Sequence, residues 1–434
     1  MTLERTLSCG LVLVALSVVT VSSAAAQSQN GTIAGVVKDA AGAVLAGVAV
    51  EASSPALIEK IRTVVTDGQG TYKIVELRPG IYTVAFALTG FNTVKREGVE
   101  LSSSFTATIN AELPAGAIAE TITLSEDSPI LDTQNVATKA VTSRQLMDAL
   151  PTDRNFTSLA SMTPGMQVVG TLQNVGGSDP ETRLMLQTHG SRIAESRLFV
   201  DGMSVMSGNG TGGVNFGNYL NNAMAQELVV NTDSMSAEFE LSGVTSNFVT
   251  REGSNAVHGS FTGRYASAGL QSNNLSSDLV ARGLSSGNRI RKIWDANPSV
   301  GGPLIEDRVW LFSSVRHWGT YNYVAGLYND LDRTALVYTP DPSSPAIQPV
   351  WHLNADARIT FQVTPRNKVN AYYHYQYSDF GTCFAPSLLT APSACAHNKN
   401  DPQWFAQASW NSALTSRLLL EAGGTITAQY SSGR

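Results

Sequence analysis

Few residues of this 434-residue chain have types and spacings that could support catalysis. Gly208, Gly210 and Gly213 satisfy the G-x-G-x-x-G pattern, whose glycines let a backbone approach a bound phosphate. Such a site needs a buried strand before the glycines and a helix after them, and the segment "VNFGNYLNN" that follows is a poor helix. We therefore expect a loop here rather than a nucleotide site.

The histidines and acidic residues point to no chemistry either. None of the six histidines forms an H-x-x-x-H pair beside an acid, the spacing that a zinc site on a helix would use. Asp67 stands beside Gly68 and close to Gly70, where an aspartate usually hydrogen-bonds its own backbone in a turn. We expect no enzyme, no metal site and no cofactor.

The N-terminus indicates export. An apolar run covers residues 11–21, and small residues at Ala24 and Ala26 precede Gln27, a pattern typical of a secretory signal peptide over residues 1–26. A membrane anchor is the alternative, although it needs about 20 apolar residues. Cys9 precedes the apolar run and is expected to leave with the signal.

Cys383 and Cys395 remain, both in one polar stretch between strand-like segments. An even count of cysteines in an exported chain suggests a single local disulfide, and two unpaired thiols are the alternative. The chain has a net charge of -6 and no cluster of Lys and Arg, which argues against a nucleic-acid partner. Its 37 glycines favour a β-rich, turn-rich protein.

Residues 31–113 predict a small β-sandwich. Turn patterns such as "DAAG", "DGQG" and "RPG" separate short strand-like runs. In "GIYTVAFAL" the residues Tyr82, Val84, Phe86 and Leu88 share one face, as in a half-buried strand. The seven expected strands are "TIAGVVKD", "VAVEAS", "RTVVTD", "TYKIVEL", "GIYTVAFAL", "FNTVKREGVEL" and "FTATINAEL".

A pattern of glycine, acidic and apolar positions runs through this segment. It consists of Gly35, Asp39, Gly42, Gly47, Val48, Val50, Thr66, Asp67, Gly70, Tyr72, Leu77, Pro79, Gly80, Tyr82, Gly90 and Phe91. With these residues the segment resembles the carboxypeptidase regulatory-like domain, an accessory module with a transthyretin-like sandwich. The resemblance implies no peptidase chemistry.

A linker with one short extended run, "ETITL", follows the sandwich. A strand-like run in a linker can add to the sheet edge of another protein. Equally, it can be the last strand of the sandwich or the first strand of the next domain, and periodicity does not separate these alternatives. Beyond it, "SRQLMDALP" and "RNFTSLASMTPG" predict short helices, and "SRLFVDGMSV" predicts a strand and a turn, which indicates a small α/β domain.

Four segments follow one another in order: "ALPTDRNFTSLASMTPGM", "THGSRIAESRLFVDGM", "AQELVVNTDSMSAEFELSGVTSNFVTREGSNAVHGSF" and "NPSVGGPLIEDRVWLFSS". Together they resemble the plug and first barrel strands of TonB-dependent outer-membrane receptors, especially Oar-like receptors with a regulatory-like domain before the plug. Family plugs commonly carry an Arg-Gly pair where this chain has His189-Gly190, so the plug-to-barrel contact of that arginine is not expected. Under this resemblance the TonB box consists of Glu120, Thr121, Ile122, Thr123 and Leu124.

After His258 apolar and polar residues alternate regularly. In "VNAYYHYQYS" Val369 and Tyr373 share a face with other apolar residues, and Asn370 and His374 lie on the opposite, polar face. Short turns such as "TPRNK" and "NSALTS" alternate with the long polar stretches 268–291 and 378–400, as in a transmembrane β-barrel. A soluble antiparallel sheet with one wet face is the alternative.

About seven such strands are expected between residues 258 and 430, whereas barrels that hold a plug have about 22. The sequence therefore resembles the N-terminal part of a longer receptor. We expect a mainly β protein with a signal peptide (1–26), a transthyretin-like sandwich (27–114), a linker (115–128), an α/β plug (129–252) and the first antiparallel barrel strands (253–434).

The resemblance implies a receptor in the bacterial outer membrane, with its sandwich and plug on the periplasmic side. It would take up a small ligand, such as an iron chelate, a glycan or a peptide, with TonB as its energy-coupling partner. A surface-exposed protein that binds carbohydrate or protein without transport is the alternative. The hypothesis of a secreted enzyme with a carbohydrate-binding accessory domain is less favoured, because no catalytic motif supports it.

Overall fold

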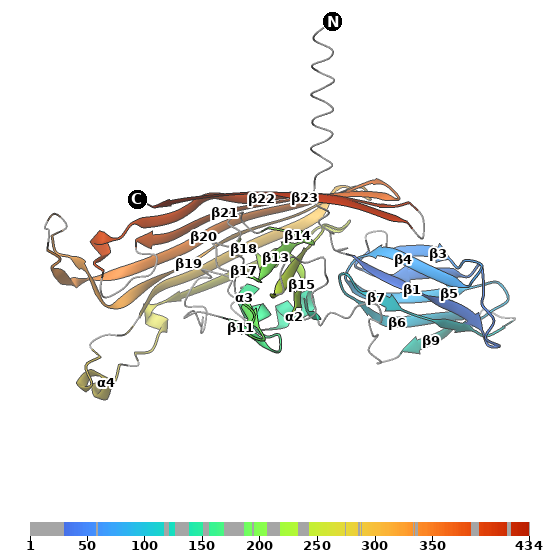
Figure 1. Ribbon diagram of the computed structural model, residues 1–434, viewed down its shortest axis with the longest axis horizontal. Coiled ribbons are helices and arrows are strands. Elements are labelled where there is room, and N and C mark those ends of the chain that lie inside the picture. Colours follow the sequence, from blue (N-terminus) through green and yellow to red (C-terminus); the bar gives the residue numbers. More distant parts are fainter. Residues whose placement is uncertain are drawn as a thin grey trace, which may run out of the picture.

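The computed structural model divides into a sandwich, a small α/β domain and a long antiparallel sheet (Figure 1). Strands dominate all three parts, so the expected mainly β fold is confirmed. The structure describes residues 30–57, 60–116, 121–125, 139–150, 156–168, 186–192, 195–205, 218–232, 243–273, 275–284, 287, 289–332, 334, 337–382, 390–414 and 418–433. The predicted signal peptide and Gly208, Gly210 and Gly213 lie outside these residues.

The sandwich has two sheets. One contains β4-β1-β7, with β8 also paired to β1, and the other has the order β3-β2-β5-β6-β9. The segment expected as one last strand, "FTATINAEL", is divided into two short strands, which both pair in parallel with β1. The strands are β1 (Gly31–Asp39), β2 (Ala49–Ser53), β3 (Ile61–Val65), β4 (Thr71–Leu77), β5 (Gly80–Ala87), β6 (Thr93–Leu101), β7 (Thr106–Thr108), β8 (Ala111–Leu113) and β9 (Thr121–Ser125).

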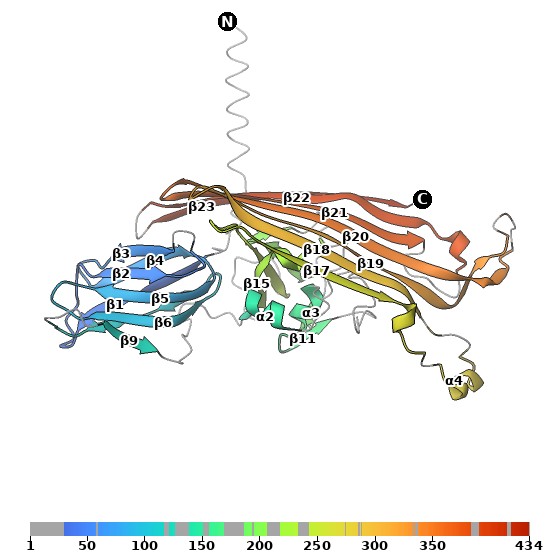
Figure 2. The same ribbon diagram turned by 180° about the vertical axis from the view of Figure 1, so that it is seen from behind.

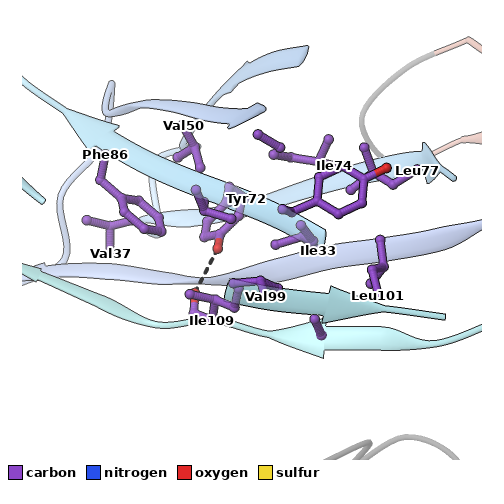
Figure 3. Close-up of a cluster of buried hydrophobic side chains, with 14 of the residues drawn as sticks. Ile33, Val37, Val50, Tyr72, Ile74, Leu77, Phe86, Val99, Leu101 and Ile109 are labelled. Carbon is purple, nitrogen blue, oxygen red and sulfur yellow. Dashed lines mark hydrogen bonds between the residues drawn. The ribbon is translucent and has the colours of Figure 1, made fainter. Parts of the chain in front are cut away.

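The core of the sandwich follows the predicted alternation. Tyr82, Val84 and Phe86 are buried on one face of β5, as expected for a half-buried strand. Figure 3 shows Tyr72 within this core, where its hydroxyl donates a hydrogen bond of 2.8 Å to the Ile109 carbonyl oxygen. Burial raises the pKa of Tyr72 well above its usual value, so the hydroxyl keeps its proton and remains a donor.

The α/β domain is built around a five-stranded sheet with the order β10-β15-β16-β13-β14. The two predicted helices are present, and Ser143 caps α2 by accepting a hydrogen bond from the Leu146 amide. Its elements are β10 (Lys139–Ser143), α2 (Arg144–Ala149), α3 (Phe156–Ala160), β11 (Met166–Val168), β12 (Leu186–Thr188), β13 (Arg197–Val200), β14 (Met203–Ser204), η2 (Asn222–Met224), β15 (Ala225–Asn231) and β16 (Thr245–Thr250).

Seven antiparallel strands then pair in sequence order, which matches the expected number. They are β17 (His258–Ser267), β18 (Arg289–Ile305), β19 (Val309–Asp330), β20 (Pro340–Thr364), β21 (Asn367–Thr382), β22 (His397–Ala413) and β23 (Leu419–Gly433). The short turns at one end join β18 to β19, β20 to β21 and β22 to β23. The longer connections at the other end include η3 (Ala268–Leu270), α4 (Ser277–Ala281) and η4 (Pro392–Ala394).

Several strands are longer than their alternating segments suggest. β19 has 22 residues and β20 has 25, whereas about 9–11 residues are enough to cross a bilayer. The stretch 378–400, expected as a polar loop, also contributes residues to the end of β21 and the start of β22. Ladder pairing with a neighbour keeps a polar segment extended even where its sequence has no apolar face.

The two faces of the long sheet differ as predicted. His352, Asn354 and Asp356 are buried on the inner face of β20, and the outer face of the sheet exposes large apolar side chains. Among the exposed residues are Phe261, Tyr265, Val300, Val315, Ile359, Phe361, Tyr373, Trp410, Leu420 and Ile426. Since a water-facing sheet would place these side chains in water, the pattern is typical of a sheet whose outer face meets lipid.

The long sheet curves over the α/β domain in both views (Figures 1 and 2). Phe312, Tyr372 and Phe405 of the sheet share one apolar cluster with residues of the α/β domain, such as Leu228 and Phe248. The sandwich lies beside the α/β domain, under the end of the sheet that carries the short turns. None of the helices in the described part of the chain is both long and apolar enough to cross a membrane.

Candidate functional site: an ionic junction of three domains

The three parts of the chain meet at the buried carboxylate of Glu252. This residue follows β16 and precedes the first strand of the long sheet. A Cβ at Gly253 would come within 2.6 Å of the Leu311 carbonyl oxygen, so glycine lets this segment pass close against β19. Arg358 of β20, Lys368 of β21 and Arg78, which lies between β4 and β5 of the sandwich, converge on Glu252.

The contacts use both carboxylate oxygens of Glu252. Arg358 Nη2 donates to Oε1 at 2.7 Å. Oε2 accepts a hydrogen bond from Arg78 Nη2 and lies 3.3 Å from Lys368 Nζ. One carboxylate of the α/β domain therefore connects to the long sheet through two cations and to the sandwich through a third.

A second acid, Asp201, completes the junction. It lies in the turn between β13 and β14 with φ of 48°, a conformation that aspartate tolerates better than most residues. Its Oδ1 accepts from the Thr250 amide at 2.8 Å, and its Oδ2 accepts from the Thr250 hydroxyl at 2.6 Å and from Arg358 Nη1 at 2.6 Å. Arg358 thus holds the turn of β13–β14 and the end of β16 together.

The charges of the junction explain the ionisation of Glu252. Burial by itself would raise the pKa of this carboxyl, but Arg78, Lys368 and Arg358 together hold it well below its usual value. Glu252 is therefore ionised at every physiological pH. Buried charges of this kind are stable only when each has partners, so the three domains depend on one another at this point.

Two further contacts hold the sandwich in place. The Ser103 amide donates to Glu227 Oε1 of β15 at 2.7 Å, and Asn411 Nδ2 of β22 donates to Glu76 Oε2 at 3.0 Å. Burial raises the pKa of Glu227, and the hydrogen bonds from Ser103 oppose that effect. The sandwich is consequently attached to both the α/β domain and the long sheet.

Amide side chains join the α/β domain to the inner face of the sheet at positions away from the charges. Asn221 and Asn297 exchange two hydrogen bonds, of 3.0 and 2.8 Å, and Asn221 also donates to Ser314 at 2.9 Å. The Tyr219 amide donates to Gln376 at 2.6 Å, and Gln407 donates to the Val200 carbonyl at 3.1 Å. Neutral hydrogen bonds contribute about 1 kcal/mol each, less than a buried ion pair costs when it is broken.

Two of the cavities formed by described residues lie on the long sheet. One, of about 310 Å³, lies between the sheet and the α/β domain and is lined by charged side chains that include Arg144, Arg251 and Asp295. Burial, followed by the charge of Arg144, lowers the pKa of Arg251. The other, of about 720 Å³, lies at the end with the long connections, between the segment around α4 and residues 323–328 of β19. Within the described residues, no group of three or more His, Cys, Asp or Glu could hold a metal ion.

The residues singled out from the sequence lie apart from the junction. Thr121, Ile122, Thr123 and Leu124 belong to β9, whereas Glu120 lies outside the described residues. Cys395 is disulfide-bonded. Cys383 lies outside the described residues, so its pairing with Cys395 stays a prediction.

Two further expectations concern turns. Asp67 is the predicted turn residue, since its Oδ1 accepts hydrogen bonds of 3.0 Å from the Gln69 and Thr71 amides. His189 and Gly190 form a turn after β12, and both have positive φ. The contact between domains instead uses Asp201 and Glu252, which sequence reasoning missed. One residue could have indicated the junction from the sequence. Arg358 lies on the polar, inward face of an alternating strand, and a buried cation there requires a buried acid as its partner.

Comparisons with known proteins give a family model and a relative for parts of this chain. Residues 32–114 match the family model described as "Carboxypeptidase regulatory-like domain". Over 300 residues the chain is 32% identical to the TonB-dependent transporter Oar of Myxococcus xanthus, and the match covers 67% of this chain. The chain spans 27% of the length of that relative.

Two solved structures show a weaker similarity to this chain. A mutant of the ferric enterobactin receptor of Pseudomonas aeruginosa matches with a TM-score of 0.47 and 11% identity, over 67% of this chain and 41% of the receptor. The outer membrane transporter YddB of Escherichia coli matches with a TM-score of 0.46 and 15% identity, over 68% of this chain and 39% of the transporter.

Proposed function

Because the chain is a relative of the Oar-like TonB-dependent receptors, we propose that it forms the N-terminal part of a receptor for energy-coupled uptake across the outer membrane. Residues 129–252 would be the plug and residues 253–434 the first barrel strands. They follow the sandwich predicted over residues 27–114 and the linker predicted over residues 115–128, of which residues 121–125 form β9 of the sandwich. The observation that carries the proposal is a sheet with an apolar outer face and a polar inner face, against which the α/β domain is packed and ion-paired.

The outer face of the sheet supports a position in a membrane. Trp294 and Tyr321 lie edge to face with ring centroids 5.2 Å apart, and Trp351 stacks on Tyr377 at 4.8 Å. Lys292 Nζ lies 4.5 Å from the centre of the Trp294 ring. Aromatic side chains with a nearby cation are typical of the interface between lipid and water on a transmembrane barrel. The sandwich, at the opposite end of the sheet, would then face the periplasm.

The ligand is expected at the end with the long connections. There, the cavity of about 720 Å³ is lined by Leu275, Leu279 and Tyr323 among others, and Arg289 lies over the Tyr323 ring at 5.0 Å. A mixed apolar, aromatic and cationic lining suits an iron chelate, a glycan or a peptide. The same surface would serve a receptor that binds carbohydrate or protein without transport, which is the alternative function.

Energy coupling distinguishes the two functions. We propose Glu120, Thr121, Ile122, Thr123 and Leu124 as the TonB box, the strand with which TonB would pair. Main-chain hydrogen bonds supply most of the affinity in such pairing, so the segment must stay extended and keep its donors. Proline at Ile122 removes one donor and fixes φ, whereas alanine keeps both the donor and the extended conformation.

The test compares Ile122→Pro with Ile122→Ala in the complete receptor to which these residues belong. Ligand uptake and ligand binding at the cell surface are measured separately. We expect the proline variant to lose uptake and retain binding, and the alanine variant to keep both. If the proline variant transports normally, the TonB box is assigned to the wrong segment, and the surface-binding alternative is then favoured.

A further inference from the structure

Four of the five residues of the proposed TonB box, Thr121–Leu124, belong to β9 of the sandwich. β9 pairs in parallel with β6, with Thr93 opposite Thr121, Lys95 opposite Thr123 and Glu97 opposite Ser125. It is the last strand of the sheet order β3-β2-β5-β6-β9. One edge of β9 is therefore bonded to β6, and no strand of the described part of the chain occupies its other edge.

The two terminal strands of this sheet differ in how they are protected. β3 carries Arg62, whose guanidinium donates to the carbonyl oxygens of Val75 and Glu76 in the opposite sheet, at 2.8 and 3.0 Å. A charged residue and a side-chain cover are devices that prevent a sheet edge from pairing with another chain. β9, with the sequence "TITLS", contains no charged residue and no proline. It is thus the edge of this sheet that is suited to strand addition.

The position of β9 agrees with such a role. In both views β9 lies on the side of the sandwich that faces away from the long sheet (Figures 1 and 2). A partner in the periplasm would reach it without displacing the α/β domain. The sandwich that holds β9 is in turn attached to Glu252 through Arg78 and to Glu227 through Ser103.

We propose that the energy-coupling protein adds an extended strand to the free edge of β9 while β9 stays paired with β6. This inference rests on the proposed function and assigns the sandwich a part in it. The sandwich holds the binding strand extended before the partner arrives, which removes the entropic cost of ordering a flexible linker segment. Pulling force would then pass through the sandwich to the junction at Glu252.

The competing mechanism is displacement, in which the partner pairs with β9 only after β9 has left β6. A disulfide across the two strands separates the mechanisms. Lys95 and Thr123 are register partners on the accessible face, so Lys95→Cys with Thr123→Cys places two thiols side by side. A matched control, Glu51→Cys with Thr63→Cys, crosslinks β2 to β3 in the same sheet and leaves β9 free.

Binding of the purified periplasmic domain of TonB is measured for the oxidised and the reduced form of each double variant. We expect oxidation to change the Kd by less than about twofold in both, since the free edge of β9 remains available. A loss of tenfold or more on oxidation of the β6–β9 pair, reversed by a reductant and absent from the control, would establish displacement and overturn the inference. If TonB binds neither the unsubstituted chain nor its variants, the proposed TonB contact itself is wrong.

Hydrogen exchange on the unsubstituted chain gives an independent readout that needs no cysteines. Strand addition should slow the exchange of amides in β9 and leave β6 as protected as before. Faster exchange over residues 94–97 of β6 when TonB is present would show that β9 has left the sheet, and it would contradict the inference.

Discussion

Removing the charge of Glu252 should weaken the attachment of all three domains at once. Glu252→Gln keeps the shape of the side chain and removes the carboxylate that Arg358, Lys368 and Arg78 share, while the ion pair of Arg358 with Asp201 remains. Breaking one partner of a buried ion pair costs about 3–5 kcal/mol. Arg78 and Lys368 keep 15% and 14% of their side chains exposed, so water can partly solvate them. We therefore expect the free energy of unfolding to fall by an amount near the lower end of this range, about 3 kcal/mol.

The measurement is thermal unfolding of the detergent-solubilised chain, followed by tryptophan fluorescence. In a domain of 150–250 residues, each kcal/mol of lost stability lowers Tm by about 2–4 °C, so a loss of about 3 kcal/mol lowers Tm by at least about 6 °C. Glu97→Gln is the matched control, since Glu97 is paired with Lys95 at 2.6 Å but 45% of its side chain is exposed. An exposed pair of this kind contributes less than about 1 kcal/mol. Equal falls in Tm for Glu252→Gln and Glu97→Gln would refute the conclusion that Glu252 joins the three domains.

The stabilising contribution of Glu252 has a defined pH dependence. The pKa of Glu252 is lowered in the folded protein, so its stabilising contribution is fully present above the usual glutamate pKa of about 4.3. That contribution disappears as the pH falls through the lower, folded value. The difference in stability between the unsubstituted chain and Glu252→Gln should therefore be constant at neutral pH and shrink only in strong acid. A difference that already shrinks between pH 7 and 5 would contradict the lowered pKa.

Three further predictions concern the sandwich and the N-terminus. Tyr72→Phe removes the donor to the buried Ile109 carbonyl and should cost about 1–3 kcal/mol in urea unfolding of the sandwich; an unchanged midpoint would contradict this. A sandwich that ends at residue 125 should be more stable than one that ends at 116, on the order of 1 kcal/mol, because β9 adds five residue pairs to β6; equal melting temperatures would argue against β9 as an integral strand. N-terminal sequencing of the exported protein should begin near Gln27, and a chain that retains residues 1–21 would exclude the signal peptide.

Local periodicity was sufficient for much of the architecture. The alternation in "GIYTVAFAL" predicts the buried face of β5, and that in "VNAYYHYQYS" predicts which residues of β21 face the α/β domain, because neighbouring side chains of any strand point to opposite faces. The number of long strands also follows from the sequence, since each turn is a local feature. Strand ends were less predictable, because pairing with a neighbour extends β19 and β20 beyond their alternating segments.

The junction and the place of β9 required the tertiary structure. Arg78, Asp201, Glu252 and Arg358 are separated by more than a hundred residues at their extremes, and no spacing rule connects residues from three domains. "ETITL" has the composition of a strand, which left open whether it pairs with the sandwich, with the next domain or with another protein. Its pairing with β6 was decided by which sheet edge lies within reach once the sandwich has folded. Hydrogen-bond partners of a strand are set by packing in three dimensions, whereas its tendency to be extended is set by its own residues.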